Sequence, residues 1–112
     1  MESVGDATPW TVDRDRRPYA LQVIVPKRTY VLPWTQFLYA EGGPGDVRVV
    51  FSVHDVVVRG SGLDALLTDL AAHVVTVLRQ PLQAEKFLQA PGPRVLSVEV
   101  RRVEGGGQLA AT

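Results

Sequence analysis

The sequence predicts a small α+β domain, in which an antiparallel or mixed β-sheet of about five to seven strands carries one main amphipathic helix on one face. Three observations lead to this prediction. Several segments place apolar side chains at every second position, which is typical of strands. One segment after residue 61 instead repeats its leucines at spacings of three and four, which is typical of a helix. The chain also has 19 valines against one isoleucine, which favours a sheet as the main source of the core.

Composition bounds the range of functions. A length of 112 residues suits one domain, and 12 basic against 12 acidic residues give a net charge of zero. Neutrality argues against the broad positive field of a nucleic-acid or membrane-surface binder. The absence of cysteine excludes disulfides, thiolate metal sites and a cysteine nucleophile. No signal peptide and no membrane-length apolar run are found, so we expect a cytoplasmic protein with no membrane partner.

Three regions are expected along the chain. Residues 1–17 mix small, polar and charged types without a period, and we expect a flexible N-terminal arm. Residues 18–104 form the single folded α+β domain. Residues 105–112 begin with three glycines, carry no charge and are expected to be a flexible tail.

The first half of the domain reads as strands separated by breaker residues. A turn is expected at 26–28, where proline presets the backbone angle of a tight turn, and a loop is expected at 41–46. Pro33 cannot donate a backbone hydrogen bond, so it should mark a break or an edge. The strands expected here are 19–25, 29–32 and 35–40.

Two valine-rich runs, 47–53 and 56–58, predict a hairpin. With His54 and Asp55 as the two corner residues, Val53 would pair with Val56 and Phe51 would pair with Val58. A slip of one residue would bring Arg48 and Arg59 into the core, so the pattern favours this arrangement of faces. The core face would hold Val49, Phe51, Val53, Val56 and Val58, and the opposite face Arg48, Val50, Ser52, Val57 and Arg59.

The helix should begin at Ser61-Gly62-Leu63-Asp64, which has the spacing of a capping box, and should end near His73. A strand is expected at 74–79, although the helical period could continue through it. A helical turn is expected at 83–88 and a last strand at 94–103. The stripe that packs on the sheet is Leu63, Leu66, Leu67, Leu70, Ala71 and Val74.

Catalytic and metal-binding patterns are not found. The two histidines, His54 and His73, do not form a closely spaced ligand pair, and Ser61 lacks the Gly-x-Ser-x-Gly pattern of a nucleophile elbow. We therefore expect a non-enzymatic protein without a metal or cofactor. One small-ligand alternative stays open, because free amides at a helix N-terminus attract anions. Its residues would be Arg59, Gly60, Ser61 and Gly62.

Two macromolecular interactions are also considered. Basic residues near aromatic ones could hold single-stranded nucleic acid. The candidate contacts are Arg14, Arg16, Arg17, Lys27 and Arg28. The leading hypothesis, however, is that the chain acts through protein–protein contacts and forms a homodimer, because one helix covers only one face of the sheet and leaves valines on the other. The predicted dimer interface is Arg48, Val50, Val57 and Arg59.

Overall fold

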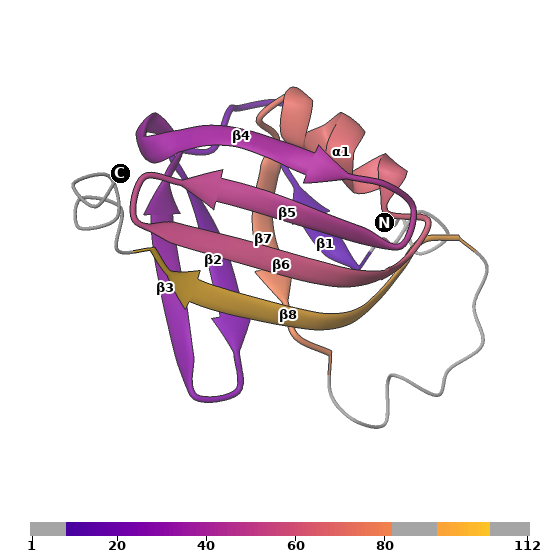
Figure 1. Ribbon diagram of the computed structural model, residues 1–112. Coiled ribbons are helices and arrows are strands. Elements are labelled where there is room, and N and C mark those ends of the chain that lie inside the picture. The colour runs from indigo at the N-terminus through magenta and orange to yellow at the C-terminus, as the bar shows by residue number, and fades with distance from the viewer. Residues whose placement is uncertain (1–8, 82–91, 104–112) are drawn as a thin grey trace.

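The computed structural model describes residues 9–81 and 92–103, which form eight strands in two sheets and one α-helix (Figure 1). One four-stranded sheet has the order β1-β7-β2-β3, and the other has the order β4-β5-β6-β8. The elements are β1 Trp10–Val12, β2 Ala20–Val25, β3 Arg28–Pro33, a 3-10 helix Trp34–Gln36, β4 Phe37–Gly42, β5 Asp46–Phe51, β6 His54–Ser61, α1 Asp64–Ala71, β7 Val75–Arg79 and β8 Arg94–Arg102.

The expectation of a single sheet is wrong, although the combination of mostly strands with one helix is confirmed within the described residues. The chain changes sheet at Pro33. Because proline cannot extend a ladder, β3 ends there, and the 3-10 helix Trp34–Gln36 turns the chain into β4 of the second sheet. The chain returns to the first sheet at β7, which pairs parallel with β2 and antiparallel with β1.

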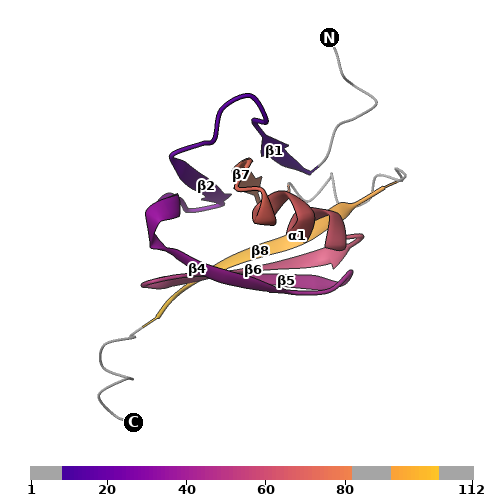
Figure 2. The same ribbon diagram turned by 90° about the horizontal axis from the view of Figure 1, so that it is seen from above.

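The core lies between the two sheets, whose strands cross one another as two stacked layers (Figure 1). Figure 2 shows that α1 lies on the side of the β4-β5-β6-β8 sheet that faces the other sheet. Leu66 and Leu70 are 0% and 1% exposed, so these leucines of the predicted packing stripe face the core, whereas Ala71 of the same stripe is exposed. The largest fully buried side chains are Phe51, Leu21, Leu63, Leu66, Leu70, Leu78, Val23, Val47, Val49, Val56, Val58 and Val75.

The valine-rich hairpin has the predicted faces but a different register. Val49 pairs with Val56, so the turn falls at residues 52 and 53 and not at His54 and Asp55. Val53 is consequently 48% exposed and not part of the core. The observed register sets Asp55 beside Arg48, whose Nε and Nη2 atoms donate to Asp55 Oδ2 at 2.9 and 2.7 Å. This ion pair is available only in the observed register, and it gives a physical reason for the shift.

The N-terminus of α1 is not the capping box that the sequence predicts. Leu63 is the N-cap residue and no side chain caps the helix, so the predicted role of Ser61 is wrong. The Leu63 amide instead donates to the Pro44 carbonyl at 3.0 Å. At the other end, His73 has a φ of 57°, the left-handed conformation that usually follows a helix.

The folded unit begins earlier than the sequence predicts. Residues 10–12 of the expected arm form β1, and Trp10 is 3% exposed. The Trp10 indole donates to Asp69 Oδ2 of α1 at 2.9 Å, and Arg14 Nη2 donates to Asp69 Oδ1 at 3.0 Å. A polar residue of the helix therefore anchors a segment that no local pattern marks as folded.

The strands expected at 74–79 and 94–103 are confirmed by β7 and β8. The helical turn expected at 83–88 and the tail at 105–112 lie outside the described residues. In the part of the chain that is described, no helix is long and apolar enough to cross a membrane.

Candidate functional site: a groove beside an edge strand

A groove with a volume of about 350 Å³ opens between β3 and the turn that joins β5 to β6. This volume is within the range of ligand-binding clefts, roughly 300–1,000 Å³. Most of its lining is apolar, with a few polar groups at one side. The lining residues are Val31, Leu32, Pro33, Gln36, Phe51, Ser52, Val53 and His54.

The β5–β6 turn is held against the 3-10 helix by polar contacts and against β3 by an aromatic contact. The Ser52 amide donates to the Gln36 carbonyl at 2.9 Å, and the Ser52 hydroxyl donates to Gln36 Oε1. His54 meets the ring of Tyr30 edge-on, with 5.6 Å between the ring centroids. These contacts fix the wall of the groove relative to β3, so the groove exists before any ligand arrives.

Aromatic side chains pack behind the groove. Phe51, which lines it, lies 5.7 Å from both Trp34 and Phe37 between ring centroids. Trp34 in turn stacks on His73, with 5.1 Å between centroids and 11° between planes. The rings connect the C-terminal end of α1 to the groove and make its base rigid.

β3 forms one edge of its sheet, and a single hydrogen bond shows in which direction its backbone N–H and C=O groups point. The Trp34 amide donates to the Tyr19 carbonyl at 3.0 Å, which makes this a hydrogen-bonded pair in the β2–β3 ladder. Antiparallel pairs alternate between bonded and non-bonded. Thr29 and Val31 therefore belong to non-bonded pairs, and their N–H and C=O groups point away from β2, along an edge that pairs with no other strand among the described residues.

The free edge of β3 differs from the other edges in the described residues. β1 is only three residues long, β4 has an irregular register at its start, and β8 carries several charged side chains. Short, irregular or charged edges resist pairing with another chain. β3 has only one charged residue, Arg28, and its Val31 side chain is 65% exposed.

The residues of the predicted anion site span the end of β6 and its connection to α1. The Gly60 amide donates to the Gly45 carbonyl at 3.0 Å and the Leu63 amide is also bonded, so two of the amides near the helix start are occupied. Asp64 in the first turn adds a negative charge that opposes an anion. Arg59 lies 3.9 Å from Glu99, on the neighbouring strand.

The predicted nucleic-acid contacts do not gather on one surface. Arg14 pairs with Asp69, while Arg16 and Arg17 precede β2 and the remaining pair, Lys27 and Arg28, lies at its other end. A strand of that length separates the two groups by about 17 Å. The structure thus splits the basic set into two exposed pairs, 16–17 and 27–28, neither of which has an ion pair among the described residues.

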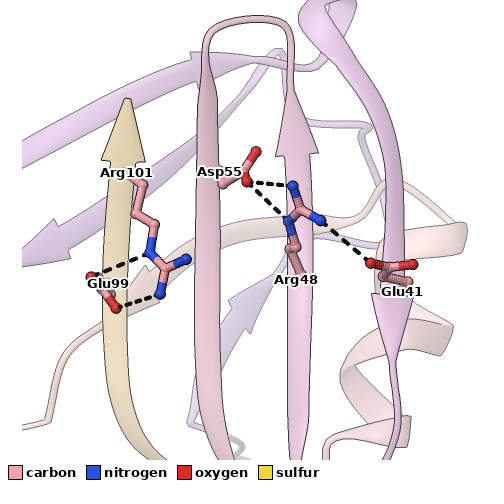
Figure 3. Close-up of polar contacts among 5 residues, drawn as sticks. All are labelled: Glu41, Arg48, Asp55, Glu99 and Arg101. Carbon is pink, nitrogen blue, oxygen red and sulfur yellow. Dashed lines mark hydrogen bonds and ion pairs between the residues drawn. The ribbon is translucent and has the colours of Figure 1, made fainter. Parts of the chain in front are cut away.

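The predicted dimer interface lies on the outer face of the β4-β5-β6-β8 sheet. Val50 and Val57 are each 7% exposed in the single chain, so they offer little apolar surface to a second copy. Ion pairs occupy much of this face, and Figure 3 shows Arg48 between Asp55 and Glu41. Glu99 and Arg101 form another pair, at 3.3 Å.

Arg48 is the central charge of that face. Its hydrogen bonds to Asp55, followed by the attraction of the same carboxylate, raise the pKa of Arg48 above its ordinary value. Asp55 is 6% exposed, and its second oxygen, Oδ1, has no hydrogen-bond partner among the described residues. Arg48 therefore supplies the compensation that a buried carboxylate needs.

The groove itself is not predicted by the sequence. Its two walls come from segments about 20 residues apart, and only the fold brings them together. Two local signals do point towards it: the break at Pro33, and the valine at 31 on the non-core face of a short strand. Within the described residues, no three His, Asp or Glu side chains converge in a way that could hold a metal ion.

No protein-family model matches the sequence, and no curated protein or solved structure matches the chain.

Proposed function

We propose that this chain is a protein-interaction module that binds an extended polypeptide segment as an added strand on the free edge of β3. One observation carries the proposal: the N–H and C=O groups of Thr29 and Val31 point outward from the strand edge, and Val31 also lines the apolar groove. Strand addition supplies backbone hydrogen bonds for affinity, and a neighbouring pocket supplies side-chain specificity. The proposed role is binding, and it involves no covalent step.

The structure also favours β3 over the surface suggested by the sequence. A second copy docked on Arg48 and Arg59 would meet a face already covered by ion pairs, with the two valines almost buried. Val31 is instead 65% exposed on a strand edge. We therefore place the partner on β3 and not on the outer face of the second sheet.

The test uses peptides selected from a random library of 12-residue sequences displayed on phage, with the full chain as the immobilised target. Bound peptides should shift the backbone amide NMR signals of Thr29 and Val31, because these amides gain acceptors. Val31→Lys places a charge on the edge and should abolish binding. Leu38→Lys is the matched control, since Leu38 is also well exposed, at 60%, but lies on β4. Loss of binding in both variants, or unmoved signals at residues 29 and 31, would refute the proposal.

A further inference from the structure

The chemistry of the bound segment can be specified further, given the proposed strand addition on β3. Two features lie along the path that an added strand would follow. The apolar groove lies beside Leu32 and Pro33, at the end of β3. Two exposed cations, Lys27 and Arg28, lie at the beginning of β3.

These cations have no ion pair among the described residues, unlike Arg14, Arg48, Arg59 and Arg101, which all contact carboxylates. Lys27 in the turn and Arg28 at the start of β3 are both exposed, so they can meet a partner laid along the strand. Charges placed at the rim of a binding site guide the partner and select its register. Lys27 and Arg28, which have no ion pair in the described part of the chain, therefore complement a negative charge on the bound segment.

The spacing follows from strand geometry. Arg28 and Leu32 are four residues apart, and a strand rises about 3.3 Å per residue, so the cations and the groove are separated by about 13 Å. A second strand running along β3 has the same rise. We infer that the recognised segment is an acidic peptide in extended conformation, with an aspartate or glutamate about four residues from an apolar side chain that enters the groove.

The test continues with the phage-selected peptides and the full chain. The enriched sequences should contain an acidic residue about four positions from a leucine, isoleucine, valine or phenylalanine. Replacing that acidic residue by glutamine or asparagine in the synthetic peptide should weaken binding about tenfold. The double variant Lys27→Glu/Arg28→Glu should weaken binding of the acidic peptide by a similar factor, measured by isothermal titration calorimetry.

A matched double variant, Arg16→Glu/Arg17→Glu, separates local recognition from general attraction. It makes the same change in net charge with exposed residues at the opposite end of β2. Binding should change by no more than about twofold, because those charges lie more than a Debye length from the acidic residue of the peptide. An equal loss in both double variants would overturn the inference.

Other occupants of the edge give different results. One other occupant is single-stranded DNA. If a DNA 12-mer displaces the peptide and has a higher affinity for the chain, the edge is a nucleic-acid surface and the inference is overturned. A free chain that sediments as a dimer, and becomes a monomer in Val31→Lys, would identify a second copy as the occupant and also overturn it. Peptides that shift the Thr29 and Val31 amides but show no acidic preference would refute this inference alone. If the selection yields no peptide that shifts the Thr29 and Val31 amide signals, the proposed function is refuted as well.

Discussion

His73 combines an unfavourable backbone with favourable side-chain contacts, and the balance between them can be measured. Its φ of 57° is in the left-handed region, where the two hydrogen bonds that close α1 place it. The His73 amide donates to the Leu70 carbonyl at 3.0 Å, and the Val74 amide donates to the Asp69 carbonyl at 3.3 Å. Glycine is the usual residue at this position, because an L side chain there costs about 1–2 kcal/mol.

The ring of His73 offsets this cost. It stacks on Trp34 with 5.1 Å between centroids, and it meets Phe37 edge-on at 5.4 Å. Aromatic pairs of this kind contribute about 0.5–1.5 kcal/mol each, so the two contacts together contribute about 1–3 kcal/mol. The histidine therefore holds the end of the helix against the aromatic residues behind the groove.

Two substitutions separate the terms. His73→Ala removes the ring and keeps the strained backbone, so it should lower the free energy of unfolding by about 1–3 kcal/mol. His73→Gly also removes the ring but relieves the strain, at an entropic cost of about 0.5–1 kcal/mol in the unfolded chain. The glycine variant should therefore be intermediate, more stable than the alanine variant by about 0.5–1 kcal/mol.

Urea unfolding followed by circular dichroism measures these differences, with equal m-values as the condition for comparing midpoints. Ala72→Gly is the control, since Ala72 is exposed and has a helical φ of −86°, and glycine there should destabilise by roughly 1 kcal/mol. An alanine variant at least as stable as the glycine variant would show that the strain of the left-handed backbone does not exceed the entropic cost of glycine, about 0.5–1 kcal/mol, and would contradict the expected order. A glycine variant as stable as the natural chain would show that the ring contacts only balance the net strain that glycine relieves, about 0.5–1 kcal/mol, at or below the lower end of the expected contribution.

Three further outcomes are expected in the same unfolding assay. Asp69→Ala removes the acceptor of the buried Trp10 indole and should lower the free energy of unfolding by about 1–3 kcal/mol. Asp69→Asn keeps an acceptor and should lower it less. Gly60→Ala should lower the free energy of unfolding by about 1–3 kcal/mol, because its Cβ would overlap a carbonyl oxygen of β8. Gly43→Ala, which has open space around its Cβ, should change it by no more than about 0.5 kcal/mol. Arg48→Met should lower the unfolding midpoint more than the double variant Arg48→Met/Asp55→Leu, because only the single change leaves a buried carboxylate uncompensated. A double variant less stable than the single one would contradict that reading of the ion pair.

The hairpin shows both the power and the limit of the hydrophobic pattern. Alternation determines which residues face the core, because a slip of one residue would bury arginines. Moving the turn by two residues shifts the strand pairing by four residues and keeps every residue on its face, so the pattern alone cannot distinguish a turn at 54–55 from the observed turn at 52–53. The choice depends on the contact between Arg48 and Asp55, which is invisible until the strands are paired.

The division into two sheets was also beyond local reasoning. The helical stripe and the alternation of β2 are properties of short segments, and both were predictable. The parallel pairing of β2 with β7 joins residues more than 50 positions apart, such as Val23 and Leu78. The anchoring of Trp10 by Asp69 spans 59 positions. Contacts of this kind follow from tertiary packing, for which a single sequence has no periodic signal.

The candidate site and the change of sheet have a common origin at Pro33. Proline ends β3, and the Trp34 amide still reaches the carbonyl of Tyr19, the residue that precedes β2, so the chain bends immediately after this bond. It then leaves for the second sheet, and β7 returns on the opposite side of β2. Among the described residues, no strand pairs with the outer edge of β3, and the same bend leaves the groove between that strand and the β5–β6 turn. An extended peptide that pairs with Val31 would thus occupy the position of a further strand beside β3.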